Sequence, residues 1–400
     1  MLRASRGWLM HALAVAGVTA GLGGAAFAQS VKVGLITTYS GPMASQGDQI
    51  EKGVNLFMKL NGSKLPSGVK VEIIKRDDTG INPETAKRLA QELIVRDKVQ
   101  LLAGVVWTPN AAAIAPLATE AKVPFVIMNA ATSMITTLSP YMARTSMTLW
   151  QSSYPMGQWA AKKYKRVYVA VSDYGPGHDA QDAFTKAFTA AGGEIVGAVR
   201  MPPPTLEFAP YLQRIKDAKP QAVFAFVPAG KSATSLIKGF GDLGLAEAGI
   251  KLIGTGDIVT DEELPNMGEV PLGVITMFHY SSAGERPANK AFVSAYQKEY
   301  GPNAWPGFMV VGAWDGMQAI FDVVRAQNGK IDPDKTMALL KSWKNPDSPR
   351  GPISIDPATR DIVQNEYVRE TRKVGRVVAN VEIETIPMVK DPWKVINKKQ

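Results

Sequence analysis

The sequence contains no cysteine among its 400 residues and only three histidines. Without cysteine the chain cannot form a disulfide framework, a thiolate nucleophile or an iron–sulfur site, and three histidines are too few for a histidine-rich metal site. No apolar run beyond the N-terminal segment is long enough to span a bilayer. An apolar content of 46% with 20% charged residues indicates a globular chain rather than a disordered one. This length predicts two domains.

Residues 1–28 have the layout of a secretory signal peptide. Two arginines precede an apolar stretch over residues 8–20, and small residues follow up to Ala26-Phe27-Ala28. We therefore predict cleavage after Ala28 and a periplasmic location. An uncleaved membrane anchor is the alternative, but the apolar stretch is short and rich in glycine. Removal of this segment, which carries two arginines and no acidic residue, leaves 372 residues with a formal charge of +7.

Short β-branched or aromatic runs alternate with helical patterns along the rest of the chain. Several of these runs are apolar nearly throughout, as expected for parallel strands that are covered on both faces. The alternation predicts an α/β fold with parallel sheets and right-handed crossovers. The predicted strands cover residues 31–37, 69–75, 99–106, 123–128, 166–172, 194–200, 222–227, 251–254 and 273–279.

This rhythm breaks twice. After Thr145 a Met/Thr/Trp-rich connection leads to a helix predicted from about Pro155, and a new series of strands follows. After His279 the pattern returns to helices and then changes to alternating polar and apolar residues, which predict antiparallel strands. These strands are expected at residues 353–356, 364–372 and 377–384, followed by a charged surface tail.

Two nucleotide-binding patterns in the sequence fail in their detail. The loop before Gly230-Lys231-Ser232 has a single glycine, and Pro228 removes an amide that should face a phosphate. The G-x-G-x-x-G match at residues 239–244 ends a helix, whereas the dinucleotide motif opens one. The basic residues are spread out rather than clustered, which argues against nucleic acid as a partner. Asp77-Asp78 ends a strand, and we interpret it as a pair of solvated turn carboxylates.

The sequence also lacks a nucleophile elbow and an H-E-x-x-H helix, so we predict that the protein is not an enzyme. No cofactor and no metal ion are expected. A positive net charge favours the attraction of small anions.

Two loops with hydroxyl groups follow neighbouring predicted strands. In Trp107-Thr108-Pro109-Asn110, Thr108 is the predicted N-cap and Pro109 the first helical residue, so free amides, a helix dipole and a hydroxyl could hold a carboxylate. The alternative is a cap that only closes its own helix. The second loop, residues 129–133, contains Thr132. Because ligands of open α/β sheets bind at the carboxyl ends of the strands, both threonines are expected at one ligand site.

Four short motifs follow one another along the chain: Ser40-Gly41-Pro42, the Thr108 loop, Ala130-Ala131-Thr132 and Asp173-Tyr174-Gly175-Pro176-Gly177. In this respect the chain resembles, over essentially its whole mature length, the periplasmic binding proteins of the leucine/isoleucine/valine type, which serve ABC importers. The resemblance implies two doubly wound parallel-sheet lobes that are joined by three crossover segments and close on a ligand. It implies an N-terminal lobe of residues 29–147 plus 280–355 and a C-terminal lobe of residues 148–279 plus 356–400.

The resemblance also implies roles for single residues. Thr108 and Thr132, with backbone amides that include that of Ala130, would hold the ligand carboxylate. Gln46 would lie at the cleft edge of the first lobe, and Tyr174 of the second lobe would pack on the ligand. Pro228 is expected on the cleft rim, because its loop follows a strand. The implied partners are a permease and its ATPase subunits, and the protein itself is expected to be a monomer.

The departures from the family pattern bear on the ligand. Amino-acid binders of this type hold the ammonium group with acids, but Leu149-Trp150-Gln151-Ser152 has none and Asp257 is displaced by about one position. Aromatic surface near the inferred cleft is expected from Trp107, Trp150, Tyr174, His279 and Tyr280. The alternative for some of these rings, Trp150 in particular, is ordinary packing. We therefore predict an aromatic carboxylate of the benzoate or cinnamate type. A branched-chain or other amino acid is the alternative ligand, and a ligand-sensing module for a receptor is the alternative role.

Overall fold

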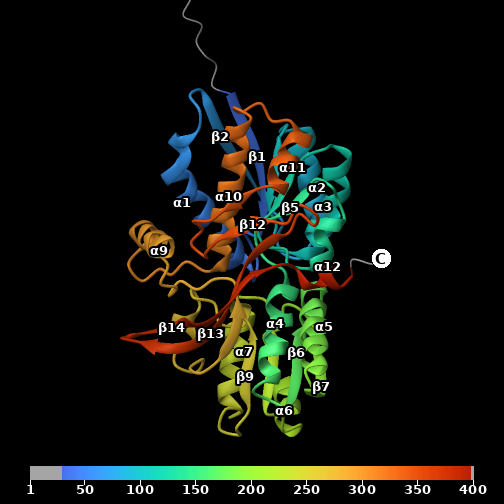
Figure 1. Cartoon of the computed structure of the whole chain (residues 1–400), viewed down its shortest axis with the longest axis vertical. Helices are drawn as coiled ribbons and strands as arrows, with labels where there is room; N and C mark the ends of the chain where they lie inside the picture. Colours follow the sequence, from blue (N-terminus) through green and yellow to red (C-terminus); the bar gives the residue numbers. More distant parts are fainter. Residues whose placement is uncertain (1–28, 398–400) are drawn as a thin grey trace, which may run out of the picture.

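The computed structural model describes residues 29–397, which form two α/β lobes stacked end to end (Figure 1). The predicted signal peptide, residues 1–28, lies outside the described residues. None of the helices within residues 29–397 combines the length and apolar character that a membrane span requires.

The upper lobe in Figure 1 is built on a five-stranded parallel sheet with the order β2-β1-β3-β4-β5. Its strands are β1 (Gln29–Thr37), β2 (Val69–Asp77), β3 (Leu101–Gly104), β4 (Phe125–Ile127) and β5 (Met142–Arg144). The helices of this lobe are α1 (Ala44–Asn61), α2 (Pro83–Val95), α3 (Thr108–Glu120), α9 (Pro287–Tyr300), α10 (Phe308–Ala326) and α11 (Pro333–Lys341).

Alternation along the strands explains why helices cover both faces of this sheet. Val33 of β1 packs in one apolar cluster with Ile50 of α1 and Val310 of α10. Ile36 of the same strand points to the opposite face of the sheet. It packs in a separate cluster with residues of α2 and α3, such as Leu89. Successive side chains of a strand point to opposite faces, so both faces must be buried.

The lower lobe is built on a larger, mixed sheet with the order β11-β12-β13-β10-β9-β8-β6-β7, and β14 pairs with β13. Its strands are β6 (Arg166–Ser172), β7 (Glu194–Met201), β8 (Ala222–Phe226), β9 (Lys251–Thr255), β10 (Ile275–Phe278), β11 (Lys344–Asn345), β12 (Ile353–Ile355), β13 (Ile362–Val374) and β14 (Val377–Val389). The associated helices are α4 (Leu149–Ala161), α5 (Gly175–Ala190), α6 (Ala209–Asp217), α7 (Lys231–Asp242), α8 (Leu264–Met267) and α12 (Pro392–Ile396). The predicted antiparallel strands are confirmed as β12, β13 and β14.

The chain passes between the lobes three times: after β5, after β10 and between α11 and β13 (Figure 1). Arg350 ties two of these passages together, because its buried guanidinium donates to the carbonyl oxygens of Thr145 and Ser146. The same guanidinium forms an ion pair with Asp315 at 2.8 Å. Breaking such a buried pair typically costs about 3–5 kcal/mol, so Arg350 holds the connection between the lobes in place.

One helix begins earlier than the sequence indicated. We predicted a helix from about Pro155, whereas α4 begins at Leu149. The reason is a capping box: the Thr148 hydroxyl accepts from the Gln151 amide at 3.1 Å, and the Gln151 side chain accepts from the Thr148 amide at 2.9 Å. Pro155 therefore lies inside the helix, and Trp150 lies in its first turn.

Candidate functional site

The two threonine loops meet at the carboxyl ends of β3 and β4. The hydroxyl oxygens of Thr108 and Thr132 lie 2.9 Å apart, and we call these residues the threonine pair. The prediction that Thr108 is the N-cap was wrong by one residue, because Trp107 is the N-cap and α3 begins at Thr108. The Thr108 hydroxyl bonds to the next loop instead of closing its own helix, so the alternative of a mere helix cap is also wrong.

The second lobe touches the threonine pair through Gly175. A Cβ atom on Gly175 would lie 2.8 Å from the Thr132 hydroxyl oxygen and 3.5 Å from the Thr108 methyl carbon. Gly175 is the first residue of α5, and Thr108 is the first residue of α3. Two helix N-termini therefore converge on the threonine pair, and their free amides and dipoles favour an anion there.

A buried arginine braces the loop that carries Thr132. Arg144, at the end of β5, donates to the carbonyl oxygens of Ala130 at 2.7 Å and Thr132 at 2.8 Å. Its charge is balanced by Asp361 at 2.7 Å. The Ala130 amide donates to the Val105 carbonyl at 3.1 Å. The expected role of that amide in holding a carboxylate is therefore corrected, because its hydrogen is already used.

A cavity of about 310 Å³ lies between the lobes, next to the threonine pair; we call it the inter-lobe cavity. The upper lobe contributes Gln46 and Trp107, and the lower lobe contributes Tyr174, Pro228 and Asp257. This figure includes space open to solvent; the room inside is only about 20 Å³, so the surrounding side chains must move apart before an aromatic ring can enter. The structure thus brings these five predicted residues to one cavity. Thr108, Ala130 and Thr132 do not line it but are neighbours in sequence of residues that do.

Two hydrogen bonds cross from lobe to lobe at this site. The Gln46 side-chain amide donates to the Ala229 carbonyl oxygen at 3.0 Å. The Ser133 backbone amide donates to the Asp179 carboxylate of α5 at 2.7 Å. With the contact of Gly175, these bonds show that the structure is the closed arrangement of the lobes.

Aromatic rings form two walls of the inter-lobe cavity. Tyr174 stacks on Phe226, with ring centroids 6.1 Å apart and ring planes inclined by 23°. The indole nitrogen of Trp107 donates to the Thr38 hydroxyl at 2.8 Å, and that hydroxyl donates to Asp78 at 2.6 Å. Both rings are therefore held in position before any ligand enters.

The chain to Trp107 corrects the interpretation of Asp77-Asp78 as solvated turn residues. Asp78 is fully buried, and its carboxylate also accepts from the Asn110 side chain at 2.8 Å. Burial raises the pKa of Asp78, although bonds from Thr38, Gly80 and Asn110 act in the opposite direction. Through its bonds with Thr38 and Asn110, Asp78 thus stabilises the loop after β3.

Asp257 brings the only carboxyl group among the residues that line the inter-lobe cavity. It lies in a short 3₁₀-helix, Gly256–Ile258, directly after β9. The Thr255 hydroxyl donates to its Oδ2 atom at 2.7 Å. Burial raises the pKa of Asp257 to about 6, and the bond from Thr255 limits that rise.

Three predicted aromatic residues are not part of the wall: Tyr280, which is fully buried, and the two described next. Trp150 stacks on Tyr154 of its own helix at 6.1 Å, and His279 packs between Phe278 and Phe308 at 4.5 and 6.1 Å. Neither lines the inter-lobe cavity. Burial, helped by two nearby arginines, lowers the pKa of His279 well below its ordinary value, so this ring is neutral. In this arrangement these rings pack within α4 and the passage between the lobes, and their contact with a ligand stays a prediction.

The sequence analysis missed three residues of the site: Asn129, Arg144 and Asp179. Asn129 is the first residue of a loop that was recognised, so its position at a strand end was the available signal. Arg144 interrupts an apolar strand, and a charge in such a place indicates a buried partner. Asp179 lies one turn into α5, where nothing in the local sequence indicates a contact with the other lobe.

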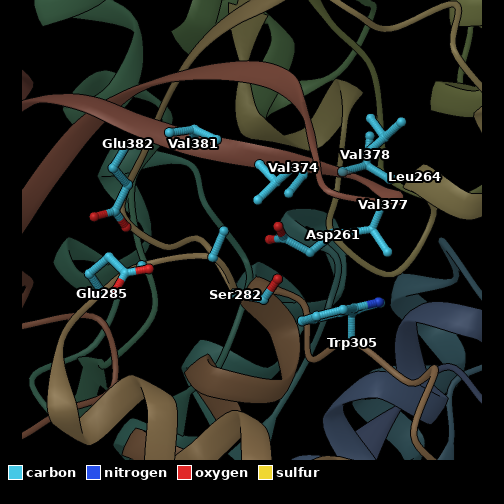
Figure 2. Close-up of a pocket in the computed structure, with 13 residues that line it drawn as sticks. Asp261, Leu264, Ser282, Glu285, Trp305, Val374, Val377, Val378, Val381 and Glu382 are labelled. Carbon is cyan, nitrogen blue, oxygen red and sulfur yellow. The ribbon is translucent and has the colours of Figure 1, made fainter.

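A larger cavity, of about 1,030 Å³, lies against the β13–β14 hairpin; we call it the hairpin cavity (Figure 2). Valines of the hairpin and Trp305 form its apolar walls, and Asp261, Glu285 and Glu382 supply its charged groups. Glu382 pairs with Arg286 at 2.6 Å and Glu285 with Lys290 at 2.5 Å. Because its ionisable lining residues are all acids, this cavity does not suit an anionic ligand.

A third cavity, of about 1,040 Å³, shares Trp107, Tyr174 and Pro228 with the inter-lobe cavity. These three residues therefore border both cavities. Within residues 29–397 no group of three or more His, Asp or Glu side chains is arranged to hold a metal ion.

Comparison with known proteins gives consistent matches over most of the chain. A family model described as "Periplasmic binding protein" matches residues 30–376. Leu/Ile/Val-binding protein homolog 6 of Brucella melitensis is 45% identical over 372 residues, which cover 92% of this chain and 94% of the relative.

Two solved structures are similar over nearly their whole length. A solute-binding protein of an ABC transporter from Rhodopseudomonas palustris BisB5, in complex with 3,4-dihydroxybenzoic acid, is 49% identical, with a TM-score of 0.87 and coverage of 92% of this chain and 99% of that chain. A solute-binding protein from R. palustris in complex with 4-hydroxybenzoate is 46% identical, with a TM-score of 0.88 and coverage of 92% and 100%.

Proposed function

The chain belongs to the periplasmic binding protein family, and from this premise we propose that it delivers a small aromatic carboxylate, of the benzoate or cinnamate type, to an ABC importer. The observation that carries the proposal is the inter-lobe cavity, which has aromatic walls and lies beside two converging helix N-termini. The similar solute-binding proteins in complex with hydroxylated benzoates support it. The protein is a binding protein and not an enzyme.

The carboxylate of the ligand is held at the threonine pair. Each hydroxyl can rotate to donate a hydrogen bond, and the N-termini of α3 and α5 add their dipoles, worth up to about 2 kcal/mol in a partly buried geometry. The ring of the ligand lies between Trp107 and Tyr174. Aromatic pairs of this kind contribute about 0.5–1.5 kcal/mol beyond the burial of apolar area.

Transport requires that the ligand changes the balance between open and closed lobes. Groups on both lobes line the inter-lobe cavity, so a ligand that contacts both binds the closed arrangement more tightly than the open one. The bonds from Gln46 to Ala229 and from Ser133 to Asp179 form only when the lobes meet. Ligand binding and these contacts therefore stabilise the same closed state, which the permease can distinguish from the open one.

Further parts of the proposal concern the setting of the protein. Membership of the family implies export to the periplasm and a permease as partner. We add that residues 1–28 are removed at Ala28, that ATPase subunits complete the importer and that the protein acts as a monomer. The lobe boundaries at 147/148, 279/280 and 355/356 also remain part of the proposal, although β11 and β12, which precede the last boundary, pair with the sheet of the lower lobe.

Isothermal titration calorimetry of the purified chain with benzoates, cinnamates and amino acids tests the function. The proposal predicts that at least one aromatic acid binds with a dissociation constant in the micromolar range or below, at about −8 kcal/mol or better. Leucine and valine should bind far more weakly. Binding of leucine or valine alone would contradict the aromatic assignment, and binding of neither class would contradict the site.

A further inference from the structure

The inter-lobe cavity carries a buried acceptor that lacks a hydrogen-bond partner in the described part of the chain. Asn129, in the loop after β4, is only 8% exposed and lines the cavity. Its side-chain amide donates to the Val106 carbonyl at 3.0 Å, which fixes its orientation. The opposite atom, Oδ1, is buried and unpartnered. A buried acceptor left without a donor is costly, so this position calls for a donor from a ligand or a water molecule.

A second acceptor enters the same cavity from the other lobe. Asp257 is 5% exposed, and one of its carboxylate oxygens already accepts from Thr255. A carboxylate has room for several hydrogen bonds, so Asp257 can still accept from a ligand. The positive charge of Arg369 lowers the pKa of Asp257, but the Arg369 guanidinium already donates to the Thr276 hydroxyl and the Tyr280 carbonyl. Asp257 therefore stays available for a donor inside the cavity.

These acceptors suit a particular kind of aromatic acid. The anionic end of the ligand is repelled by Asp257 and attracted by the helix N-termini, which fixes its direction in the cavity. The walls that surround the ring then include the hydrogen-bond acceptors Asn129 and Asp257 as well as apolar side chains. A ring hydroxyl supplies the missing donor hydrogen, whereas an unsubstituted ring leaves the Asn129 Oδ1 atom without a donor and adds none to Asp257.

Resting on the proposed function, we propose that Asp257 and Asn129 accept hydrogen bonds from ring hydroxyl groups and thereby make the protein selective for hydroxylated aromatic acids over unsubstituted ones. Asp257 contributes most, because hydrogen bonds to a charged group are about twice as strong as neutral ones. Since the two residues belong to different lobes, recognition of the hydroxyl groups also favours lobe closure.

Calorimetry with three ligands tests the proposal on the wild-type chain. 4-Hydroxybenzoate and 3,4-dihydroxybenzoate should bind at least about 10-fold more tightly than benzoate, because a site built to bond a hydroxyl rejects the analogue that lacks it. Equal affinity for benzoate and the hydroxylated acids overturns the inference but leaves the proposed function standing. Failure of all three to bind overturns the proposed function and this inference with it.

The variant Asp257→Asn tests the residue assignment. It keeps the size of the side chain and removes its charge, so the affinity for 4-hydroxybenzoate should fall about 10-fold while that for benzoate stays the same or improves. Asn129→Leu should selectively reduce the affinity for the dihydroxylated acid. Glu285→Gln is the matched control, since it removes one charge from the hairpin cavity and should change neither affinity.

Two results with these variants contradict the assignment. Equal losses for benzoate and 4-hydroxybenzoate would assign Asp257 a structural role rather than one in reading the hydroxyl. Binding of leucine to the wild type that disappears in Asp257→Asn would mean that Asp257 holds an ammonium group. A thermal melt of each ligand-free variant separates loss of folding from loss of selectivity, because misfolding lowers both affinities together.

Discussion

The inter-lobe cavity spans about 310 Å³ and the hairpin cavity about 1,030 Å³, with space open to solvent included in both, yet the smaller one is the better candidate for the ligand site. The hairpin cavity has three carboxylates among its lining residues and the inter-lobe cavity has one. Two helix N-termini converge beside the inter-lobe cavity, and groups from both lobes line it. Charge and position, rather than volume, decide which cavity can hold an anion and couple its binding to closure.

A substitution at Gly175 is expected to have the largest effect on ligand binding at the inter-lobe cavity. Gly175→Val places a side chain against the threonine pair, where even a Cβ atom would lie 2.8 Å from the Thr132 hydroxyl. Overpacking of this kind costs about 2–3 kcal/mol, and the whole cost falls on the closed state because the contact crosses the lobes. Calorimetry should show an aromatic-acid affinity about 30- to 150-fold weaker, with an unchanged melting temperature of the ligand-free protein.

Two control variants accompany Gly175→Val. Gly62→Val adds a side chain where nothing lies within 4 Å, so it should leave binding unchanged. Trp305→Ala removes the indole from the wall of the hairpin cavity (Figure 2) and should also leave binding unchanged. A loss of affinity in Trp305→Ala together with normal binding by Gly175→Val would reverse the roles assigned to the two cavities.

A smaller effect concerns the carboxyl group of the inter-lobe cavity. Burial raises the pKa of Asp257 to about 6 in the folded chain, above its ordinary value. Between the two values the folded state binds more protons than the unfolded state, so the free energy of unfolding falls as the pH rises. Between pH 5 and pH 7.5 this difference in proton binding amounts to about one pKa unit. The free energy of unfolding therefore falls by about 1.4 kcal/mol over this range.

Urea denaturation across this pH range, on wild type and Asp257→Asn, measures that contribution. Over this pH range the free energy of unfolding of the wild type should fall by about 1.4 kcal/mol more than that of Asp257→Asn. His279 acts in the opposite direction, since burial lowers its pKa, but it is present in both proteins and cancels in the difference. Identical pH profiles would show that Asp257 is not buried as a charged group in solution.

The sequence was sufficient to predict the α/β class, two of the three passages between lobes and the two loops that bear the threonines. These features depend on local patterns: apolar runs, turn residues and hydroxyls at strand ends. The third passage was implied by the family resemblance alone. Trp150 and His279 do not line the inter-lobe cavity, because an aromatic residue near a cleft in sequence can face the core as easily as the ligand. The predicted role of the Ala130 amide failed for a similar reason, since its bond to Val105 depends on how two loops pack.

Local sequence patterns could not predict the contacts between the lobes. Asp179 accepts from Ser133 across the site, and Arg144 binds two carbonyl groups of a loop that is 11 or more residues away. Such bonds depend on the relative placement of whole elements. The same holds for Asn129 and Asp257, which belong to different lobes and face one cavity only after closure.

The central claim is that an anionic ligand is held at the threonine pair between the lobes. Calorimetric titration of Thr108→Val and Thr132→Val with the aromatic acid that the wild type binds tests it most directly. Each variant removes one hydroxyl and keeps the shape of the side chain, so each should weaken binding by about 1–3 kcal/mol, while the ligand-free proteins remain folded. Unchanged affinity in both variants would contradict the account.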